Sequence, residues 1–250
     1  MNIRIATLNM EQDHKRWNAR RDLIIEQLAA IDPDLFAMNE VCIPLQTARW
    51  IQATMRERHD KHYALVQQTR VNGLSAVEGE ALLTRLPIVE TGNLDYRTRD
   101  IVALVARVLA GTTPIDVYVT HLFMSRGDES LRVYQVGQLL EWIESRNDAP
   151  ARIVCGDFNA TLDQPSAARM ARHFRPTQTA PTAFTPLADS DGSVSHPTWP
   201  RMDRCIDYIW ISDRLEVVGS EVCFNQAIGQ DPSLYPSDHA GVWADLHLSK

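Results

Sequence analysis

Apolar residues recur along the chain with two spacings, and each spacing predicts a different kind of element. A spacing of three and four residues predicts helices, most clearly over 131–145, where Val133, Val136, Leu140 and Ile143 share one face. Short alternating or continuous apolar runs predict strands. The helices expected on this basis cover 20–31, 45–58, 131–145 and 165–173. The expected strands cover 3–9, 35–38, 62–67, 81–85, 101–109, 115–120, 152–155, 206–211, 215–224 and 242–248.

The order of these elements predicts an α/β domain that is rich in strands. Residues 111–114, Gly-Thr-Thr-Pro, join two expected strands as a hairpin would, which favours antiparallel or mixed sheets over a doubly wound parallel sheet. No linker separates two cores, so the simplest interpretation is one domain over 1–250. The segment 175–204 is rich in Pro, Thr, Ser and Asp and is expected to be a long loop, a feature that is often functional.

Composition and charge narrow the possible functions. The 250 residues are 44% hydrophobic and 23% charged, which excludes a disordered or fibrous chain. A formal net charge of −7 argues against a broad surface for non-specific nucleic-acid binding, although a local basic groove stays possible. Only Lys15, Lys61 and Lys250 are lysines among the 25 basic residues, so most are arginines, whose planar guanidinium suits phosphate.

Membrane and export signals are not visible in the sequence. The apolar run over 101–106 is six residues long, whereas a spanning helix needs about 20, so no stable membrane association is expected. The N-terminal segment is interrupted by Thr7 and Asn9 and does not form the apolar core of a signal peptide. The four cysteines lack the spacing of a zinc site. We therefore expect reduced, buried thiols in a cytoplasmic protein.

Polar side chains stand where apolar strands are expected to end, and one stands inside a strand. Most have an ordinary structural explanation when taken alone, such as a turn residue, a solvated strand end or a hydrogen-bonded histidine. Asp207 interrupts an apolar strand and, if buried, needs a partner, for which a histidine is the natural candidate. Together, these side chains would suit a hard divalent cation with acid–base groups. The set comprises Asn9, Glu40, His121, Asp157, Asn159, Asp207, Asp238 and His239.

In their order along the chain, these positions resemble the motifs of the endonuclease/exonuclease/phosphatase family of metal-dependent phosphoesterases. The resemblance runs from residue 6 to residue 242 and implies a four-layer α/β sandwich, with two facing, mostly antiparallel or mixed sheets and helices outside. The matching segments are ATLNM (6–10), MNEV (38–41), EGEALLTRLPI (78–88), VTHL (119–122), GDFN (156–159), RCIDYIW (204–210) and SDHAGV (237–242).

The resemblance also implies how the acidic and amide residues divide the work. Glu40 is the main ligand of a Mg²⁺ or Mn²⁺ ion, Asn9 helps to place the metal or the phosphate, and Asp238 is a second acidic group beside the metal. Asp157 orients or deprotonates the attacking water, and Asn159 contacts the phosphate. Whether one or two metals take part is left open.

For the histidines, the resemblance implies contacts to phosphate. His239 touches a non-bridging oxygen and Asp207 holds its tautomer, while His121 contacts the phosphate or assists the leaving group. A histidine at position 121 argues against the abasic-site branch of the family, which carries a tyrosine there. Asp100 is a loosely aligned candidate for orienting His121. Asn39 stands where the family usually has glutamine, so the contacts behind Glu40 are expected to differ.

Two further residues are candidates for substrate binding. Arg132 follows His121 in the sequence, and its competing interpretation is a solvated helix face. Trp199 lies in the long loop and either stacks on a base or substrate ring or pins the loop to the core. Arg126, Arg201 and Arg204 are further basic candidates for a groove.

The predicted function is a metal-dependent hydrolase of phosphate esters, above all a phosphodiesterase. The alternatives are a DNA or RNA nuclease of the same family and, less well supported, a non-catalytic scaffold that kept the fold. An unrelated serine hydrolase is unsupported because no Gly-x-Ser-x-Gly segment occurs. The expected partner is a phosphate-ester substrate, with nucleic acid possible and no obligate protein partner evident. The sequence leaves the natural substrate and the oligomeric state open.

Overall fold

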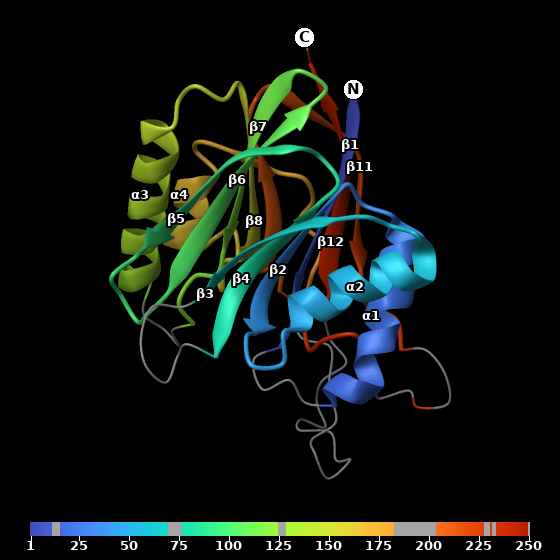
Figure 1. The fold of residues 1–250 in the computed structure, drawn as a ribbon. Helices are drawn as coiled ribbons and strands as arrows, with labels where there is room; N and C mark the ends of the chain where they lie inside the picture. Colours follow the sequence, from blue (N-terminus) through green and yellow to red (C-terminus); the bar gives the residue numbers. More distant parts are fainter. Residues whose placement is uncertain are drawn as a thin grey trace.

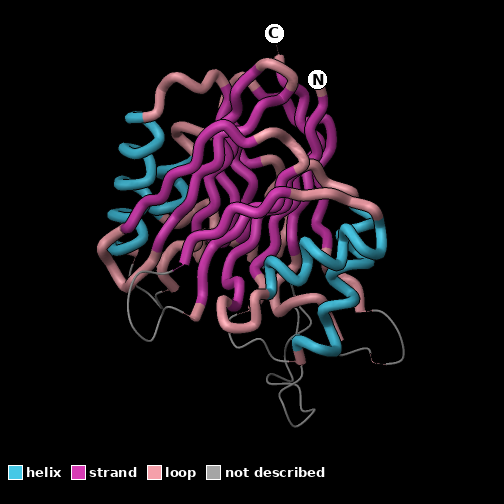
Figure 2. The backbone as a smooth tube through the Cα atoms, in the orientation of Figure 1, coloured by secondary structure: helices cyan, strands magenta, loops and turns pink. Residues whose placement is uncertain are grey.

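Two six-stranded β-sheets face each other in the computed structural model, which describes residues 1–11, 16–69, 77–124, 129–182, 204–227, 231 and 234–249 (Figures 1 and 2). The first sheet has the strand order β11-β12-β1-β2-β4-β3 and the second has β5-β6-β7-β8-β10-β9. The strands of the first sheet, in that order, are β11 (Leu215–Cys223), β12 (Gly241–Leu248), β1 (Asn2–Asn9), β2 (Leu35–Cys42), β4 (Glu78–Thr84) and β3 (Ala64–Thr69). Those of the second are β5 (Ile88–Asp95), β6 (Val102–Ala110), β7 (Thr113–Thr120), β8 (Ala151–Asp157), β10 (Asp207–Ile211) and β9 (Arg175–Pro176).

Helices cover the outer face of each sheet, so the predicted four-layer sandwich is confirmed. Helices α1 (Trp17–Ile31) and α2 (Thr47–His59) pack on the first sheet, and α3 (Ser130–Ser145) and α4 (Pro165–Met170) on the second (Figure 1). Three apolar clusters fill the layers: one between the sheets, around Ile5 and Ile153, and one beneath each pair of helices. Burial of these side chains is the main stabilising term, at roughly 25 cal/mol per Å² of apolar surface.

The expected elements occur, with differences that have physical causes. Strand β5 was not predicted, because five of its eight residues are polar or glycine and it lies half-exposed at the edge of the sheet. The two residues of β9 were assigned to the long loop, but they pair with Trp210 and Ile211 of β10. Helix α1 begins three residues earlier than predicted, at Trp17, whose ring packs in the core.

The four cysteines are buried and none forms a disulfide, as the sequence predicted. Within the described residues, none of the helices combines the length and the apolar character that a membrane crossing requires.

Each sheet contains one parallel pair of strands, and these pairs position the polar residues. Strands β1 and β2 are parallel and joined through α1, and β7 and β8 are parallel and joined through α3. Parallel neighbours end at the same edge of a sheet. The residues at or near the ends of these strands therefore lie at one edge: Asn9 ends β1, Glu40 lies two residues before the end of β2, His121 follows β7 and Asp157 ends β8.

Gly156 allows the two sheets to approach at this edge. Its φ of 133° is a conformation that side chains rarely adopt, and a Cβ there would lie 1.9 Å from the backbone oxygen of Thr120 and 2.8 Å from Oδ1 of Asn39. Any larger residue would push apart β2, β7 and β8.

We predict that Gly156→Ala lowers the free energy of unfolding by about 3 kcal/mol, and Tm by roughly 6–12 °C, because the new methyl group overlaps backbone atoms. Thermal and urea melts measure this. Gly219→Ala is the matched control, since a Cβ there would meet only Trp243, at 3.8 Å. Equal stability of the two variants would show that the close approach at Gly156 is not required.

Candidate functional site

The amide of Asn9 holds two carboxylates together between the sheets. Its Nδ2 donates to Glu40 Oε1 at 2.9 Å and to Asp157 Oδ2 at 3.3 Å, while its Oδ1 accepts from the backbone N–H of Glu11 at 3.0 Å. Glu40 comes from the first sheet and Asp157 from the second. The sandwich thus brings together residues 31 and 148 positions apart from Asn9 in the sequence.

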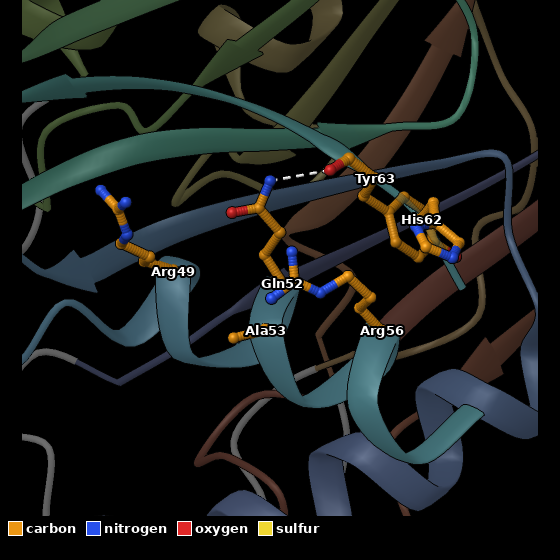
Figure 3. A pocket seen from close by; sticks show the side chains of 6 residues that line it. All are labelled: Arg49, Gln52, Ala53, Arg56, His62 and Tyr63. Atoms are coloured by element: carbon orange, nitrogen blue, oxygen red, sulfur yellow. Dashed lines mark hydrogen bonds between the residues drawn. The ribbon is translucent and has the colours of Figure 1, made fainter. Parts of the chain in front are cut away.

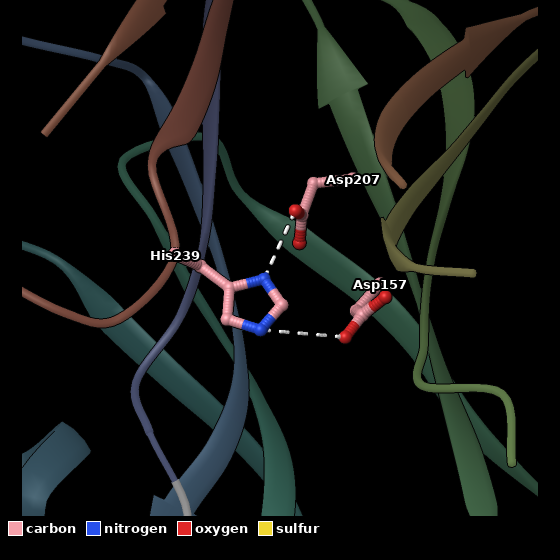
Figure 4. A group of neighbouring side chains, drawn as sticks. All are labelled: Asp157, Asp207 and His239. Atoms are coloured by element: carbon pink, nitrogen blue, oxygen red, sulfur yellow. Dashed lines mark hydrogen bonds and ion pairs between the residues drawn. The ribbon is translucent and has the colours of Figure 1, made fainter. Parts of the chain in front are cut away.

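A histidine and two aspartates form the second part of the site (Figure 4). His239 Nδ1 lies 3.0 Å from Asp207 Oδ2, and its Nε2 lies 3.8 Å from Asp157 Oδ2. Asp207 and Asp157 are register partners on the antiparallel strands β10 and β8, which places both carboxylates beside the ring. The partner that the sequence predicted for Asp207, a histidine, is therefore present.

His121 approaches the same carboxylates from the segment that follows β7. Its Nε2 lies 3.6 Å from Asp157 Oδ2, 3.8 Å from Glu40 Oε1 and 3.1 Å from Asn159 Nδ2. Asn159 also donates to the backbone oxygen of Leu122 at 2.9 Å. Its own N–H donates to Asp157 Oδ1 at 2.7 Å, so residues 157–159 form an Asx turn.

Asp238 sits at the entrance of the last strand and is held by its neighbours. Ser237 Oγ donates to the backbone oxygen of Asn9 at 2.6 Å and lies 3.3 Å from Asp238 Oδ1. The backbone N–H of His239 donates to the same hydroxyl at 3.2 Å. The serine thus ties the Ser-Asp-His turn to the end of β1.

Burial of so many charged groups shifts their proton affinities. Burial, and then the charge of Asp238, raises the pKa of Glu40 well above its ordinary value. Burial, and then the charge of Asp207, raises the pKa of Asp157 to about 7. Burial lowers the pKa of His239, but the charge of Asp207 and its hydrogen bond outweigh burial and raise that pKa well above the usual value. The carboxylates that face His239 therefore stabilise the protonated form of its ring.

A layer of buried polar residues lies behind the site; the sequence analysis named Asn39 from this layer but did not single out Glu78 or Glu80. Asn39 Nδ2 donates to Thr120 O at 3.0 Å and to a carboxylate oxygen of Glu80, and its Oδ1 accepts from the backbone N–H of Asp157 at 2.9 Å. Glu78, also buried, adds to the electrostatic field that raises the pKa of Glu40. The signal for them in the sequence was the presence of two glutamates at the start of an apolar strand, within the segment 78–88.

Arg20 is a second residue that the sequence reasoning did not single out. Its guanidinium is fully buried, pairs with Glu11 at 3.2 Å and donates to the backbone oxygens of Met10 and Pro236 at 2.8 and 2.7 Å. It therefore anchors the segments before and after the site. An arginine three and four residues before Leu23 and Ile24, on the apolar face of a helix, was the signal for it.

Of the two predicted substrate residues, Arg132 lies within the described residues and Trp199 does not. Arg132 is 2% exposed, pairs with Glu129 and donates to Phe123 O at 3.1 Å, so a solvated helix face is the wrong interpretation for it. Its contact with substrate stays a prediction, as does the role of Asp100. Trp199, Arg126 and Arg201 lie outside the described residues.

The donor set fits a divalent cation. Glu40, Asp157 and Asp238 present carboxylate oxygens, the ligands that Mg²⁺ and Mn²⁺ prefer, and the raised pKa values of Glu40 and Asp157 show that the cluster stabilises added positive charge. Asp157, Asp207 and His239 also offer ligand atoms within 4.8 Å of one another. Because Asp207 and His239 bond to each other, we interpret that trio as a hydrogen-bonded pair facing a carboxylate.

We predict that Asp207→Asn lowers the pKa of His239, since the variant loses the negative charge that outweighs burial. An NMR titration of the imidazole resonances, in EDTA, measures the shift. The resonances of His247, which bonds to Asn2 at 2.9 Å, serve as the internal control. An unchanged His239 titration would contradict the pairing with Asp207.

Comparisons with known proteins agree with this geometry. Residues 6–239 match the sequence profile of the Endonuclease/Exonuclease/phosphatase family. Human Nocturnin is 26% identical over 94% of this chain, and the CCR4-Not complex 3'-5'-exoribonuclease subunit Ccr4 of Kluyveromyces lactis is 22% identical over 94%. The chain spans 59% and 38% of the length of these two relatives. The endonuclease/exonuclease/phosphatase structure from Bacteroides vulgatus superposes with a TM-score of 0.78 at 19% identity, covering both chains completely. The chain belongs to the endonuclease/exonuclease/phosphatase family.

Proposed function

We propose that this protein is a divalent-metal-dependent hydrolase of phosphate esters that acts on phosphodiesters and uses residues 1–250 as one catalytic domain. The observation that carries the proposal is the convergence of Glu40 and Asp157 from opposite sheets, with the His239–Asp207 pair beside them. A buried carboxylate cluster next to an imidazolium is costly to fold and is typical of a site that binds a cation and an anion together.

The metal would be Mg²⁺ or Mn²⁺, held by Glu40 and Asp238 with Asn9 positioning Glu40. When bound, such an ion neutralises phosphate charge and stabilises the leaving oxygen. Asn9 contributes by fixing Glu40 Oε1 at 2.9 Å, so that the carboxylate does not have to be ordered when the ion arrives.

Asp157 is the group that orients and deprotonates the attacking water. Its Oδ1 accepts the backbone N–H of Asn159, which leaves Oδ2 turned toward Asn9, His121 and His239. A pKa raised to about 7 suits a general base that works near neutral pH.

Two histidines and Asn159 bind the phosphate oxygens. The imidazolium of His239 donates through Nε2 to a non-bridging oxygen, while Asp207 holds Nδ1 and so fixes the orientation of the ring. His121 and Asn159, 3.1 Å apart, contact the phosphate from the other side or assist the leaving group. Positioning and electrostatics dominate catalysis at phosphoryl centres. The proposed mechanism therefore uses an activated water and needs no covalent nucleophile.

A nuclease acting on RNA or DNA is the second candidate, favoured by the similarity to the exoribonuclease subunit Ccr4. Arg132 and Trp199 remain the proposed substrate contacts in either case. The complete set of acidic, amide and histidine side chains argues against a non-catalytic scaffold. Buried thiols without a disulfide support a reducing compartment, and we place the protein in the cytoplasm.

We predict that the protein hydrolyses bis(4-nitrophenyl) phosphate faster than 4-nitrophenyl phosphate, with Mg²⁺ or Mn²⁺, and that EDTA abolishes both activities. The absorbance of released nitrophenolate measures this, and the metal should restore turnover when it is added back. Turnover that persists in EDTA would contradict the metal requirement, and a faster monoester reaction would replace the diesterase with a phosphatase.

We predict that Asp157→Ala and His239→Ala each lower kcat by at least about 100-fold, since they remove the base and the phosphate donor. Asp207→Asn should cost less, about 10- to 100-fold, because it disturbs only the orientation and charge of His239. Asp163→Ala is the matched control, an exposed aspartate six residues from Asp157 whose Oδ1 accepts from Thr161 Oγ1 at 2.6 Å. Near-native activity of either alanine variant at the site would overturn its assigned role.

A further inference from the structure

A polar trough lies between α2 and the segment that leads into β3, on the outer side of the first sheet (Figure 3). Four of its residues come from one face of α2, at positions i, i+3, i+4 and i+7, and two come from the returning segment. Its volume is about 210 Å³. The lining residues are Arg49, Gln52, Ala53, Arg56, His62 and Tyr63.

Hydrogen bonds fix the walls of this trough. Gln52 Nε2 donates to the backbone oxygen of Tyr63 at 2.7 Å, which joins the helix to the returning segment (Figure 3). The Tyr63 hydroxyl donates to Pro33 O at 2.7 Å, its ring is 7% exposed, and the Arg85 guanidinium covers the ring at 5.6 Å. The trough is therefore preformed.

Two arginines at the trough differ in their pairing from the other arginines nearby. Arg49 and Arg56 are exposed, and within the part of the chain that the structure describes neither forms an ion pair. By contrast, Arg58 on the same helix pairs with Asp22 at 2.8 Å, and Arg85 pairs with Asp32 at 2.8 Å. The trough therefore presents two guanidinium groups that have no carboxylate partner among the described residues, in a protein whose net charge is negative.

His62 completes the polar lining and pairs with a carboxylate, while a second carboxylate, Glu57, follows Arg56 on α2. The His62 Nε2 lies 3.0 Å from Asp60 Oδ1, and the Asp60 side chain is 96% exposed. Water screens the exposed Asp60 carboxylate and the two exposed arginines alike, so the trough offers guanidinium groups to a ligand without excluding solvent.

We propose that this trough is a phosphate-binding site, separate from the hydrolytic site and independent of the function proposed for it. Guanidinium forks bind phosphate oxygens in pairs, and a volume of 210 Å³ holds a phosphate group with an attached sugar-sized moiety but not a folded partner. The phosphate belongs either to a small phosphorylated molecule or to a phosphodiester chain.

The position of α2 links the trough to the rim that carries Glu40. The helix begins at Thr47, whose Oγ1 accepts from the backbone N–H of Cys42, two residues after Glu40. Arg49 lies in the first turn, and Arg56 lies seven residues further along, about 10 Å away. A phosphodiester chain with one phosphate in the trough would extend along α2 toward the rim.

Calorimetric titration of the full chain with pyrophosphate and, separately, with a single-stranded tetrathymidylate tests the proposal. EDTA is present so that the carboxylate cluster carries no metal and repels anions. We expect Arg49→Gln and Arg56→Gln each to weaken binding about 5- to 10-fold. Arg58→Gln removes the same charge from the same helix, but its partner is Asp22, and should weaken binding less than about twofold. Circular dichroism melts of these surface variants should match the native protein.

The outcomes distinguish a small phosphorylated ligand from a phosphodiester chain, and they distinguish the trough from the hydrolytic site. Pyrophosphate binding that depends on Arg49 and Arg56 supports a small phosphorylated ligand, and tetrathymidylate binding that is at least tenfold tighter with the same dependence supports a phosphodiester chain. No measurable binding of either probe, or an equal loss in Arg58→Gln, overturns the proposal. Hydrolysis of bis(4-nitrophenyl) phosphate should be unchanged in both variants, and a large loss there would overturn the separation of the two sites.

Discussion

The side-chain amide of Asn39 joins the two sheets at the edge where the site forms. One residue on β2 donates to Thr120 of β7 and accepts from the backbone of Asp157 on β8, while also bonding to Glu80 on β4. The approach is possible only because Gly156 has no side chain. If this bridge opened, Glu40 and Asp157 would separate, and the contacts that Asn9 makes with both would be lost.

This arrangement concentrates negative charge between the sheets, which destabilises the folded protein. Carboxylates from both sheets are buried within a few ångströms of one another, and their raised pKa values report the unfavourable repulsion and desolvation. His239 offsets part of it by remaining protonated beside Asp207, and the buried Arg20 stabilises the flanking segments through Glu11 and two backbone oxygens. A cation and a phosphate would complete the compensation, so the site is poised for binding at the expense of stability.

Prediction from sequence succeeded where a local pattern had one physical meaning. Asp207 in an apolar strand demanded a partner, and His239 is that partner. Helix α3 was evident from its apolar spacing. Prediction from sequence failed where the apolar pattern is weak. Strand β5 is an edge strand with little apolar character, and β9 is too short to show an alternation of apolar and polar residues. Arg132 looked like a surface cation because spacing alone did not reveal its partner Glu129.

The sequence by itself determined the strand-rich α/β class and the family resemblance, because apolar spacing and short motifs can be recognised without coordinates. The four layers and the roles of the candidate site residues followed only as implications of that resemblance. Only the tertiary structure decided which atoms meet. The contact of Asn9 with Asp157, the bridge through Asn39 and the burial that raises the pKa of Glu40 all depend on residues from different sheets, tens or hundreds of positions apart. The same holds for the trough on α2, whose two arginines are ordinary in sequence and distinctive only because folding pairs the neighbouring cations and leaves these two exposed.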